Sequence, residues 1–290
     1  MTVSNDLRER VVEMLTTLST AYASPSGIFG YTEAEKPEMI YTTDIPQHVL
    51  PHFLMNVCTF DYATSATPLW KGAQKAFEDP STRFIFTPSQ VKSRGVVALR
   101  KAMEKATFYG RYPEQNANNL YRVHCTVVDK YNGNILNLLK LYRNNAHALW
   151  EARLKVGEMP VLTGPKVWPF FLRLLCDVAH IPLIGLREVP IPVDVHILRS
   201  TDRLIIGTNR APDQKRAKEV RALWSELLDG TPFYPLLIDR ELWTLSRYGC
   251  SGTDNKKTCA KKAKCPVSAW CVFSEGVYSS GNKPAGSPSA

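Results

Sequence analysis

The sequence predicts an all-α protein, because its apolar residues recur at helical spacing, helix-stop signals follow them, and strand patterns are scarce. Three amphipathic helices are indicated near residues 5–22, 120–131 and 217–228. The first follows a cap at Ser4 or Asn5, and the other two end at Asn132-Gly133 and at Gly230. Further helices are expected over 51–62 and 68–77, with a connector over 24–46. Residues 83–87 form the best strand candidate, and it is a poor one.

The composition is that of a folded, basic protein. The chain has 290 residues, of which 44% are hydrophobic and 22% charged, with a net charge of +9. These values exclude a disordered chain, a coiled coil and a collagen-like fibre, and the length predicts about two domains. The positive charge favours a polyanionic partner.

No membrane partner is expected. The most apolar window, 167–186, is interrupted by Arg173, Asp177 and His180. The N-terminus has no apolar signal core and reads as a charged amphipathic helix. We therefore expect a cytoplasmic, nucleoid-associated protein, or a nuclear one if the source is eukaryotic.

Residues 159–168, MPVLTGPKVW, indicate two helices joined by a tight turn. We expect one helix to end near Gly157 and the next to begin near Gly164, with Pro165 at its first position. Backbone N–H groups at such a helix start bind phosphate. The alternative is an ordinary corner between two core helices.

A second segment, 191–204, places Asp194 immediately before an apolar-periodic run. Asp194 is either a plain N-cap or a carboxylate held at a helix start beside a cleft. His196, two residues later, is expected to be a structural histidine.

Four of the seven cysteines are clustered near the C-terminus. Cys250, Cys259, Cys265 and Cys271 are separated by eight, five and five residues. Four thiolates so close together suit either a [4Fe–4S] cluster or tetrahedral zinc. The same stretch contains five lysines, which form either a solvated face or a phosphate-binding surface. They are Lys256, Lys257, Lys261, Lys262 and Lys264.

Taken together, these segments resemble the helix-hairpin-helix DNA glycosylase superfamily of endonuclease III and 8-oxoguanine DNA glycosylase. The resemblance is carried by residues 119–134, 162–166 (LTGPK), 192–196 (PVDVH) and 246–250 (SRYGC), in that order along the chain. Three features depart from the family pattern: Leu162 replaces the first hairpin glycine, Pro169 lies early in the second hairpin helix, and 180–187 reads as an insertion.

The resemblance implies a two-lobed helix-hairpin-helix glycosylase fold with a C-terminal cysteine-cluster loop. A six-helix barrel with the hairpin would span 46–185, and residues 1–45 and 186–275 would form the lobe that carries the cluster. DNA would lie across the groove between the lobes. Residues 276–290 are rich in Ser, Gly and Pro and are expected to be disordered.

The resemblance also implies a base-excision-repair DNA glycosylase that acts, as a monomer, on double-stranded DNA containing a damaged or mismatched base. Lys166 would form a Schiff base and give AP lyase activity, and Asp194 would be the catalytic carboxylate. The alternatives are a monofunctional glycosylase, in which Lys166 only binds phosphate, and a catalytically silent DNA-binding protein of the same fold.

The other residues that the resemblance singles out would contact DNA or a metal. Gly164 would approach phosphate, Arg111, Tyr112 and Tyr62 would fill the gap left by a flipped base, and Lys256, Lys257, Lys261 and Lys262 would bind phosphates. Core or surface aromatics are the alternative for the gap-filling residues. The resemblance favours a [4Fe–4S] cluster on the four cysteines over zinc. It leaves the lesion open, since the motif around Asp194 and the cysteine cluster point to different branches.

Overall fold

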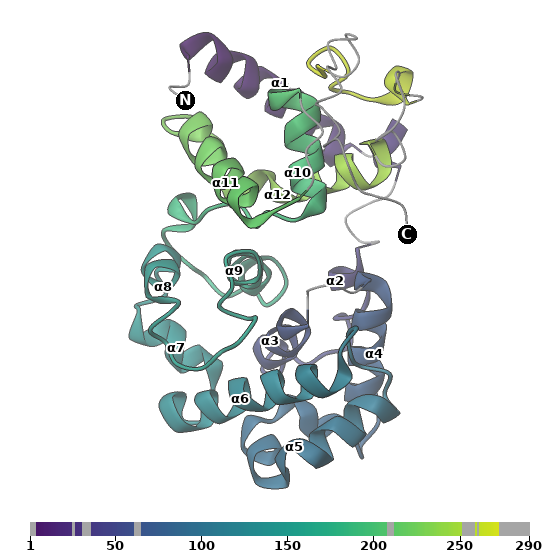
Figure 1. Cartoon of the computed structure of the whole chain (residues 1–290), viewed down its shortest axis with the longest axis vertical. Helices are drawn as coiled ribbons and strands as arrows, with labels where there is room; N and C mark the ends of the chain where they lie inside the picture. The colour runs from purple at the N-terminus through teal and green to yellow at the C-terminus, as the bar shows by residue number, and fades with distance from the viewer. Residues whose placement is uncertain are drawn as a thin grey trace, which may run out of the picture. The chain divides into compact units, whose positions relative to one another are not determined.

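The computed structural model describes residues 4–24, 27–30, 36–60, 65–207, 212–250, 259 and 261–272. Within these ranges the regular secondary structure is helical, without a strand (Figure 1). Asn145 and Ile184 form an isolated parallel bridge. The predicted all-α class is therefore confirmed. The chain divides into two compact units, Met1–Tyr31 with Val193–Ala290, and Thr32–Pro192. The tail predicted over 276–290 lies outside the described residues.

The unit Thr32–Pro192 is built around α3, which is almost completely buried. In this unit α5 and α6 pack side by side (Figure 1). Its α-helices are α2 (Pro37–Ile40), α3 (Leu50–Thr59), α4 (Ala66–Glu78), α5 (Pro88–Lys105), α6 (Pro113–Tyr131), α7 (Ile135–Leu141), α8 (Ala146–Ala152) and α9 (Val167–Asp177).

The strand candidate at 83–87 was wrong, because Arg83–Phe86 forms the 3-10 helix η3. Its apolar residues Phe84, Ile85 and Phe86 are consecutive and all buried. A half-buried strand would send alternate side chains to opposite faces, so the burial of three consecutive side chains indicates that the whole turn lies in the core. Phe86 stacks on Phe53 of α3, with ring centroids 5.1 Å apart.

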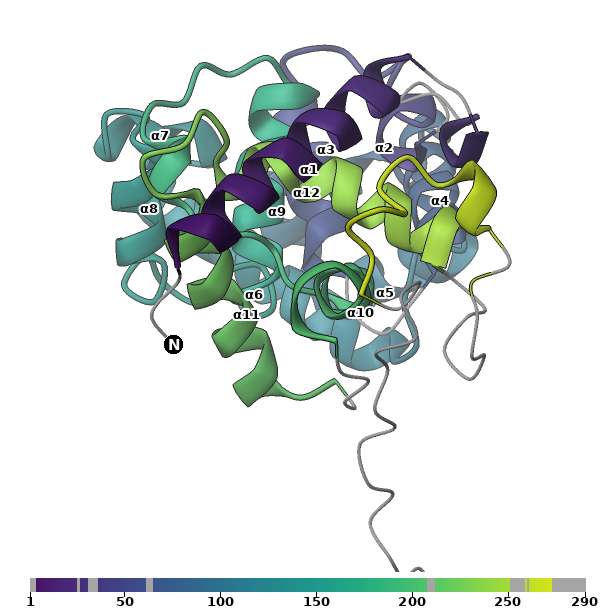
Figure 2. The ribbon, with the colours of Figure 1, turned by 90° about the horizontal axis from the view of Figure 1, so that it is seen from above.

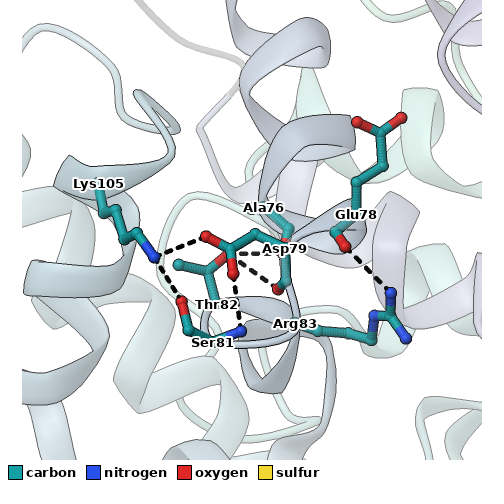
Figure 3. Close-up of polar contacts among 7 residues, drawn as sticks. All are labelled: Ala76, Glu78, Asp79, Ser81, Thr82, Arg83 and Lys105. Atoms are coloured by element: carbon teal, nitrogen blue, oxygen red, sulfur yellow. Dashed lines mark hydrogen bonds and ion pairs between the residues drawn. The ribbon is translucent and has the colours of Figure 1, made fainter.

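Polar contacts connect the end of α4 to the end of α5 (Figure 3). The Asp79 carboxylate lies 2.7 Å from Lys105 Nζ and accepts the backbone N–H of Ser81 at 2.8 Å. The Lys105 contact and the Ser81 hydrogen bonds lower the pKa of Asp79 to about 2. Thr82 donates its hydroxyl to Ala76 O at 2.9 Å, so the turn into η3 is fixed from both sides.

The other unit contains α1 (Asn5–Ala23), α10 (Val195–Thr201), α11 (Gln214–Leu228) and α12 (Pro235–Thr244). Helix α1 packs against α11 and α12, as Figure 2 shows from above. Two π-helical segments extend α10 and α12, namely η5 (Asp202–Ile206) and η6 (Leu245–Cys250). A buried hydrogen bond of 2.8 Å from Trp224 Nε1 to Thr201 Oγ1 connects α11 to α10.

Several predicted helix ends are confirmed. Ser4 caps α1 by accepting the backbone N–H of Leu7. Helix α6 ends at Tyr131, where Asn132 is left-handed with φ of 51° and the N–H of Gly133 bonds to Val127 O. Within the described helices, none combines the length and the apolar character that a membrane crossing needs.

Three expectations about helix boundaries were wrong. The connector over 24–46 contains η1 (Gly27–Phe29) and α2, and α8 ends at Ala152 rather than near Gly157. Helix α9 begins at Val167, later than the predicted start near Gly164. Pro169 therefore falls in the first turn of α9, where a backbone N–H has no partner within the helix and its loss costs no helical bond.

Candidate functional site

The predicted hairpin, residues 159–166, is a series of tight turns rather than two abutting helices. The backbone N–H and the hydroxyl of Thr163 both bond to Met159 O, at 3.1 and 3.0 Å. The N–H of Gly164 bonds to Val161 O at 2.9 Å, so the hairpin itself uses this amide. A Cβ on Gly164 would lie 2.9 Å from the same oxygen, which explains the glycine. Leu162, where the family pattern has glycine, is fully buried and anchors the turn in the core.

Lys166 is half-buried and directly precedes α9. Its neighbours along the chain are fixed, because Val167 and Trp168 are buried. Trp168 donates its ring N–H to Leu149 O of α8 at 3.1 Å and its backbone N–H to Gly164 O at 2.9 Å. The backbone of Lys166 is thus held between two anchored positions.

Asp194 is the N-cap of α10. Its Oδ1 atom accepts the backbone N–H of His196 at 2.8 Å and that of Ile197 at 3.0 Å. Both bonds use the same oxygen, and Oδ2 has no hydrogen-bond partner among the described residues. The cap therefore orients a half-buried carboxylate and leaves one of its oxygens for another role.

The start of α10 is connected to the segment that leads into the cysteine cluster. His196 Nδ1 and Arg199 Nη1 each lie 3.3 Å from the hydroxyl of Ser246, which is fully buried in η6. The His196 ring also packs against Trp243, with centroids 4.9 Å apart. These contacts support the structural interpretation of His196.

The four predicted cluster cysteines lie close enough to influence the ionisation of Cys250 and Cys265, and they belong to the unit that contains Asp194. Burial raises the pKa of the Cys250 thiol, and the nearby Cys265 and Cys271 raise it further. Burial, with contributions from Cys271 and Cys259, raises the pKa of Cys265 to about 11. Such a pKa opposes thiolate formation unless a cation binds, which is the donor chemistry of zinc and iron–sulfur sites. Over the described ranges, however, no three Cys, His, Asp or Glu side chains are arranged as a metal-binding group.

The loop that carries the last two cysteines is fixed at several points. The N–H of Val272 bonds to the carbonyl of Arg203 at 3.0 Å, and Arg10 of α1 donates to Trp270 O at 3.3 Å. Arg203 is only 2% exposed, and its positive charge offsets part of the rise in the pKa of Cys250 that burial causes. Arg203 is the nearby cation that the sequence interpretation missed. Its signal in the sequence is a charged pair, Asp202-Arg203, directly before the apolar residues 204–206.

Two of the predicted gap-filling residues line a pocket of about 620 Å³ at the start of α6. Tyr112 is 49% exposed, and the Arg111 guanidinium lies 5.6 Å from its ring centroid. The remaining lining residues are polar and follow Pro113 on α6: Glu114, Gln115, Asn118, Asn119 and Arg122. These polar residues recur every four positions, a helical spacing that can be recognised in the sequence.

Not every predicted DNA contact is covered by the structure. Tyr62, Lys256 and Lys257 lie outside the described residues. Lys261 is exposed and donates to the carbonyl of Tyr248, and Lys262 is exposed at the start of η7 (Lys262–Lys264).

Two solved structures of endonuclease III with DNA are similar to this chain in fold. A non-covalent endonuclease III–DNA complex has a TM-score of 0.55 at 16% identity, over 91% of this chain and 94% of its own. A trapped endonuclease III–DNA covalent intermediate, the estranged-adenine complex, has a TM-score of 0.54 at 16% identity, over 90% and 97%. No protein-family model matches the sequence, and no curated protein matches it. The fold implied by the hairpin and aspartate motifs is therefore confirmed: the chain has the fold of endonuclease III.

Proposed function

We propose that the protein is a DNA glycosylase of the base-excision-repair type, which cleaves the N-glycosidic bond of a damaged or mismatched base in duplex DNA. The observation that carries this proposal is the likeness to endonuclease III–DNA complexes over nine tenths of the chain. A fold hosts many functions, so the chemistry has to be argued from the chain's own residues.

Asp194 is the proposed catalytic carboxylate. Breaking an N-glycosidic bond builds positive charge on the sugar, and a fixed carboxylate stabilises that charge. The cap bonds through Oδ1 hold the group in place before the reaction, which leaves Oδ2 to face the sugar or to accept a proton from the nucleophile.

Lys166 is the proposed nucleophile. Its neutral amine attacks C1′ and forms a C–N bond, while the base leaves with the glycosidic electron pair and takes up a proton. Opening of the sugar ring gives a Schiff base. Loss of a 2′ proton then expels the 3′ phosphate, which nicks the strand. In the monofunctional alternative, Asp194 activates water and Lys166 only binds phosphate.

The other proposed contacts bind DNA. The pocket with Arg111 and Tyr112 suits the gap left by base flipping, because an exposed aromatic ring beside a guanidinium can stack on bases. Gly164 and Tyr62 are proposed to contact the duplex, and the lysines at 256, 257, 261 and 262 to bind phosphates without reading sequence.

Cys250, Cys259, Cys265 and Cys271 are proposed to hold a [4Fe–4S] cluster, with zinc as the alternative. The four cysteines interact electrostatically, and the raised pKa values of Cys250 and Cys265 oppose their ionisation in the absence of a cation, which supports this proposal. The bound group would crosslink η6 to the C-terminal loop and so support the segment that Ser246 connects to α10.

A panel of single-lesion duplexes tests the proposed function, with base release and strand nicking measured separately. Release and nicking on the same lesion support a bifunctional glycosylase, and release alone supports a monofunctional one. Duplex binding without release from any lesion, even at high enzyme excess, would support the catalytically silent alternative.

A further inference from the structure

Residues 156–158, here called the strap, connect the turn after α8 to the hairpin and are held against α6. Tyr131 donates its hydroxyl to Val156 O at 2.6 Å, and Thr126 donates its hydroxyl to Glu158 O at 2.8 Å. Both donors are buried. On the exposed edge, the Arg122 guanidinium lies 3.0 and 3.1 Å from the two Glu158 carboxylate oxygens. Two successive turns of α6 therefore hold the strap from both of its ends.

Gly157, at the centre of the strap, presses its backbone onto α6. Its φ of +115° lies in a region that residues with a side chain rarely adopt. A Cβ there would lie 2.7 Å from Thr126 Cγ2 and 3.1 Å from Lys130 Cδ. The close approach leaves no room for the strap to slide along the helix, so its register on α6 is fixed.

Hydrogen bonds continue from the strap to Lys166. The N–H of Met159 bonds to Gly157 O at 3.0 Å, and Met159 O accepts both the N–H and the hydroxyl of Thr163. Gly164 O then accepts the N–H of Trp168 at 2.9 Å, and Lys166 lies between these two residues. The backbone position of Lys166 therefore depends on where α6 holds the strap.

We propose that Tyr131, Thr126 and Gly157 form a clamp, here called the α6 clamp, that positions Lys166 for its attack on the sugar. The inference rests on the proposed function. The clamp residues are positioning residues that act through the hairpin and touch no reacting atom. Displacing a reacting group by about 1 Å costs on the order of 100-fold in rate, so removing one clamp bond has a measurable effect.

Four variants test the clamp. Tyr131→Phe and Thr126→Val each remove one hydroxyl with little change in shape, and Thr126→Ser keeps the hydroxyl. Tyr121→Phe is the matched control, since it removes a hydroxyl from the same helix, and that hydroxyl faces Lys92 O at 3.5 Å rather than a strap carbonyl. The measurements are the single-turnover rate of borohydride-trapped adduct formation on an abasic-site duplex and the Kd for a duplex with a tetrahydrofuran abasic analogue.

We expect Tyr131→Phe and Thr126→Val to slow adduct formation about tenfold or more, with Kd within about twofold of wild type. Thr126→Ser and Tyr121→Phe should react at the wild-type rate. Wild-type rates in both Tyr131→Phe and Thr126→Val would overturn the proposal. So would a rate loss that merely follows a loss of folded protein, measured by thermal melting.

Hydrogen exchange in the free protein separates a failure of the clamp from a failure of the proposed function. The amides of Thr163 and Gly164 should exchange several-fold faster in Tyr131→Phe than in Tyr121→Phe. Unchanged exchange would overturn the clamp. Wild-type protein that forms no adduct would contradict the lyase proposal and the catalytic use of the clamp, and faster exchange would still establish that α6 holds the hairpin.

Discussion

The Oδ1 atom of Asp194 accepts the backbone N–H of Ile197 at 3.0 Å, so the proposed catalytic carboxylate is also the N-cap of α10. A carboxylate used in this way has two separable properties. Its Oδ1 atom caps the helix, and its negative charge would serve the reaction. Asparagine caps a helix about as well as aspartate but carries no charge, which allows the two properties to be tested apart.

Asp194→Asn should abolish base excision while duplex binding stays within a few-fold of wild type and the free energy of unfolding changes by less than about 0.5 kcal/mol. Asp194→Ala should also be inactive and should lose about 1 kcal/mol of stability with the cap. Single-turnover base release and urea unfolding measure these effects. Normal excision by Asp194→Asn would remove this carboxylate from the mechanism.

Protein purified without oxygen should be brown and contain iron and sulfide at about four of each per chain. Cys265→Ala should lose the metal, and Cys125→Ala, which alters a cysteine outside the cluster, should retain it. Elemental analysis and the visible spectrum are the measurements. Colourless protein with one zinc would favour the alternative metal, and metal-free native protein would contradict a metal centre.

Replacing Lys256, Lys257, Lys261 and Lys262 with glutamine should weaken binding to all duplexes about equally. Removing one lysine–phosphate interaction flattens the log–log salt dependence of binding by about 0.9 units, so the slope should change by at most about 3.6 units. Lesion and control duplexes titrated over a salt series provide the measurement. A slope that does not change would mean that these lysines only face solvent, and a selective loss of lesion binding would mean that they read the damage.

Acid should destabilise the unit Thr32–Pro192 through two histidines, the half-buried His52 and the fully buried His124. Burial lowers the pKa of His52 to about 4 and that of His124 to about 3. His52 Nε2 accepts the N–H of Ile135 at 3.2 Å, and His124 Nε2 lies 3.1 Å from Asn56 Oδ1. Below about pH 6.5 the unfolded chain binds protons that the folded chain does not, so stability falls as the pH drops from 6.5 towards 4.

Each histidine contributes at most about 1.4 kcal/mol per pH unit over that range, and nothing above it. The double variant His52→Gln, His124→Gln should lose most of this slope in urea unfolding measured at pH 7, 6 and 5. His147→Gln, which alters an exposed histidine, is the control. A double variant with the wild-type slope would contradict the assignment.

Local sequence patterns were sufficient for most of the long helices. The apolar spacing and caps of α1, α6 and α11 are confirmed because each helix buries one stripe against its unit. Local patterns failed where contacts with residues distant in the sequence determine the secondary structure. Residues 83–87 look extended, but Thr82 and the packing around Phe53 turn them into η3.

The insertion at 180–187 is another long-range case. Ile184 bonds through its backbone to Asn144 and Ala146, and Gly185 lies close to the Asn145 side chain that caps α8. No local sequence pattern predicts that backbone pairing. At the candidate site, the Asp194 cap could be predicted from its position before an apolar run. The strap could not, because its register is set by Thr126 and Tyr131, whose bonding partners in the strap lie 32 and 25 residues later in the sequence.

The most direct test of the central claim is borohydride trapping of the protein on a duplex that carries an abasic site, followed by peptide mapping of the adduct. The account predicts a covalent protein–DNA adduct on Lys166 that is lost in Lys166→Ala, while Lys155→Ala, a change at an exposed lysine between α8 and the strap, traps as wild type does. Undiminished trapping in Lys166→Ala would show that another amine reacts. No adduct and no base release from any duplex that the protein binds would contradict the account.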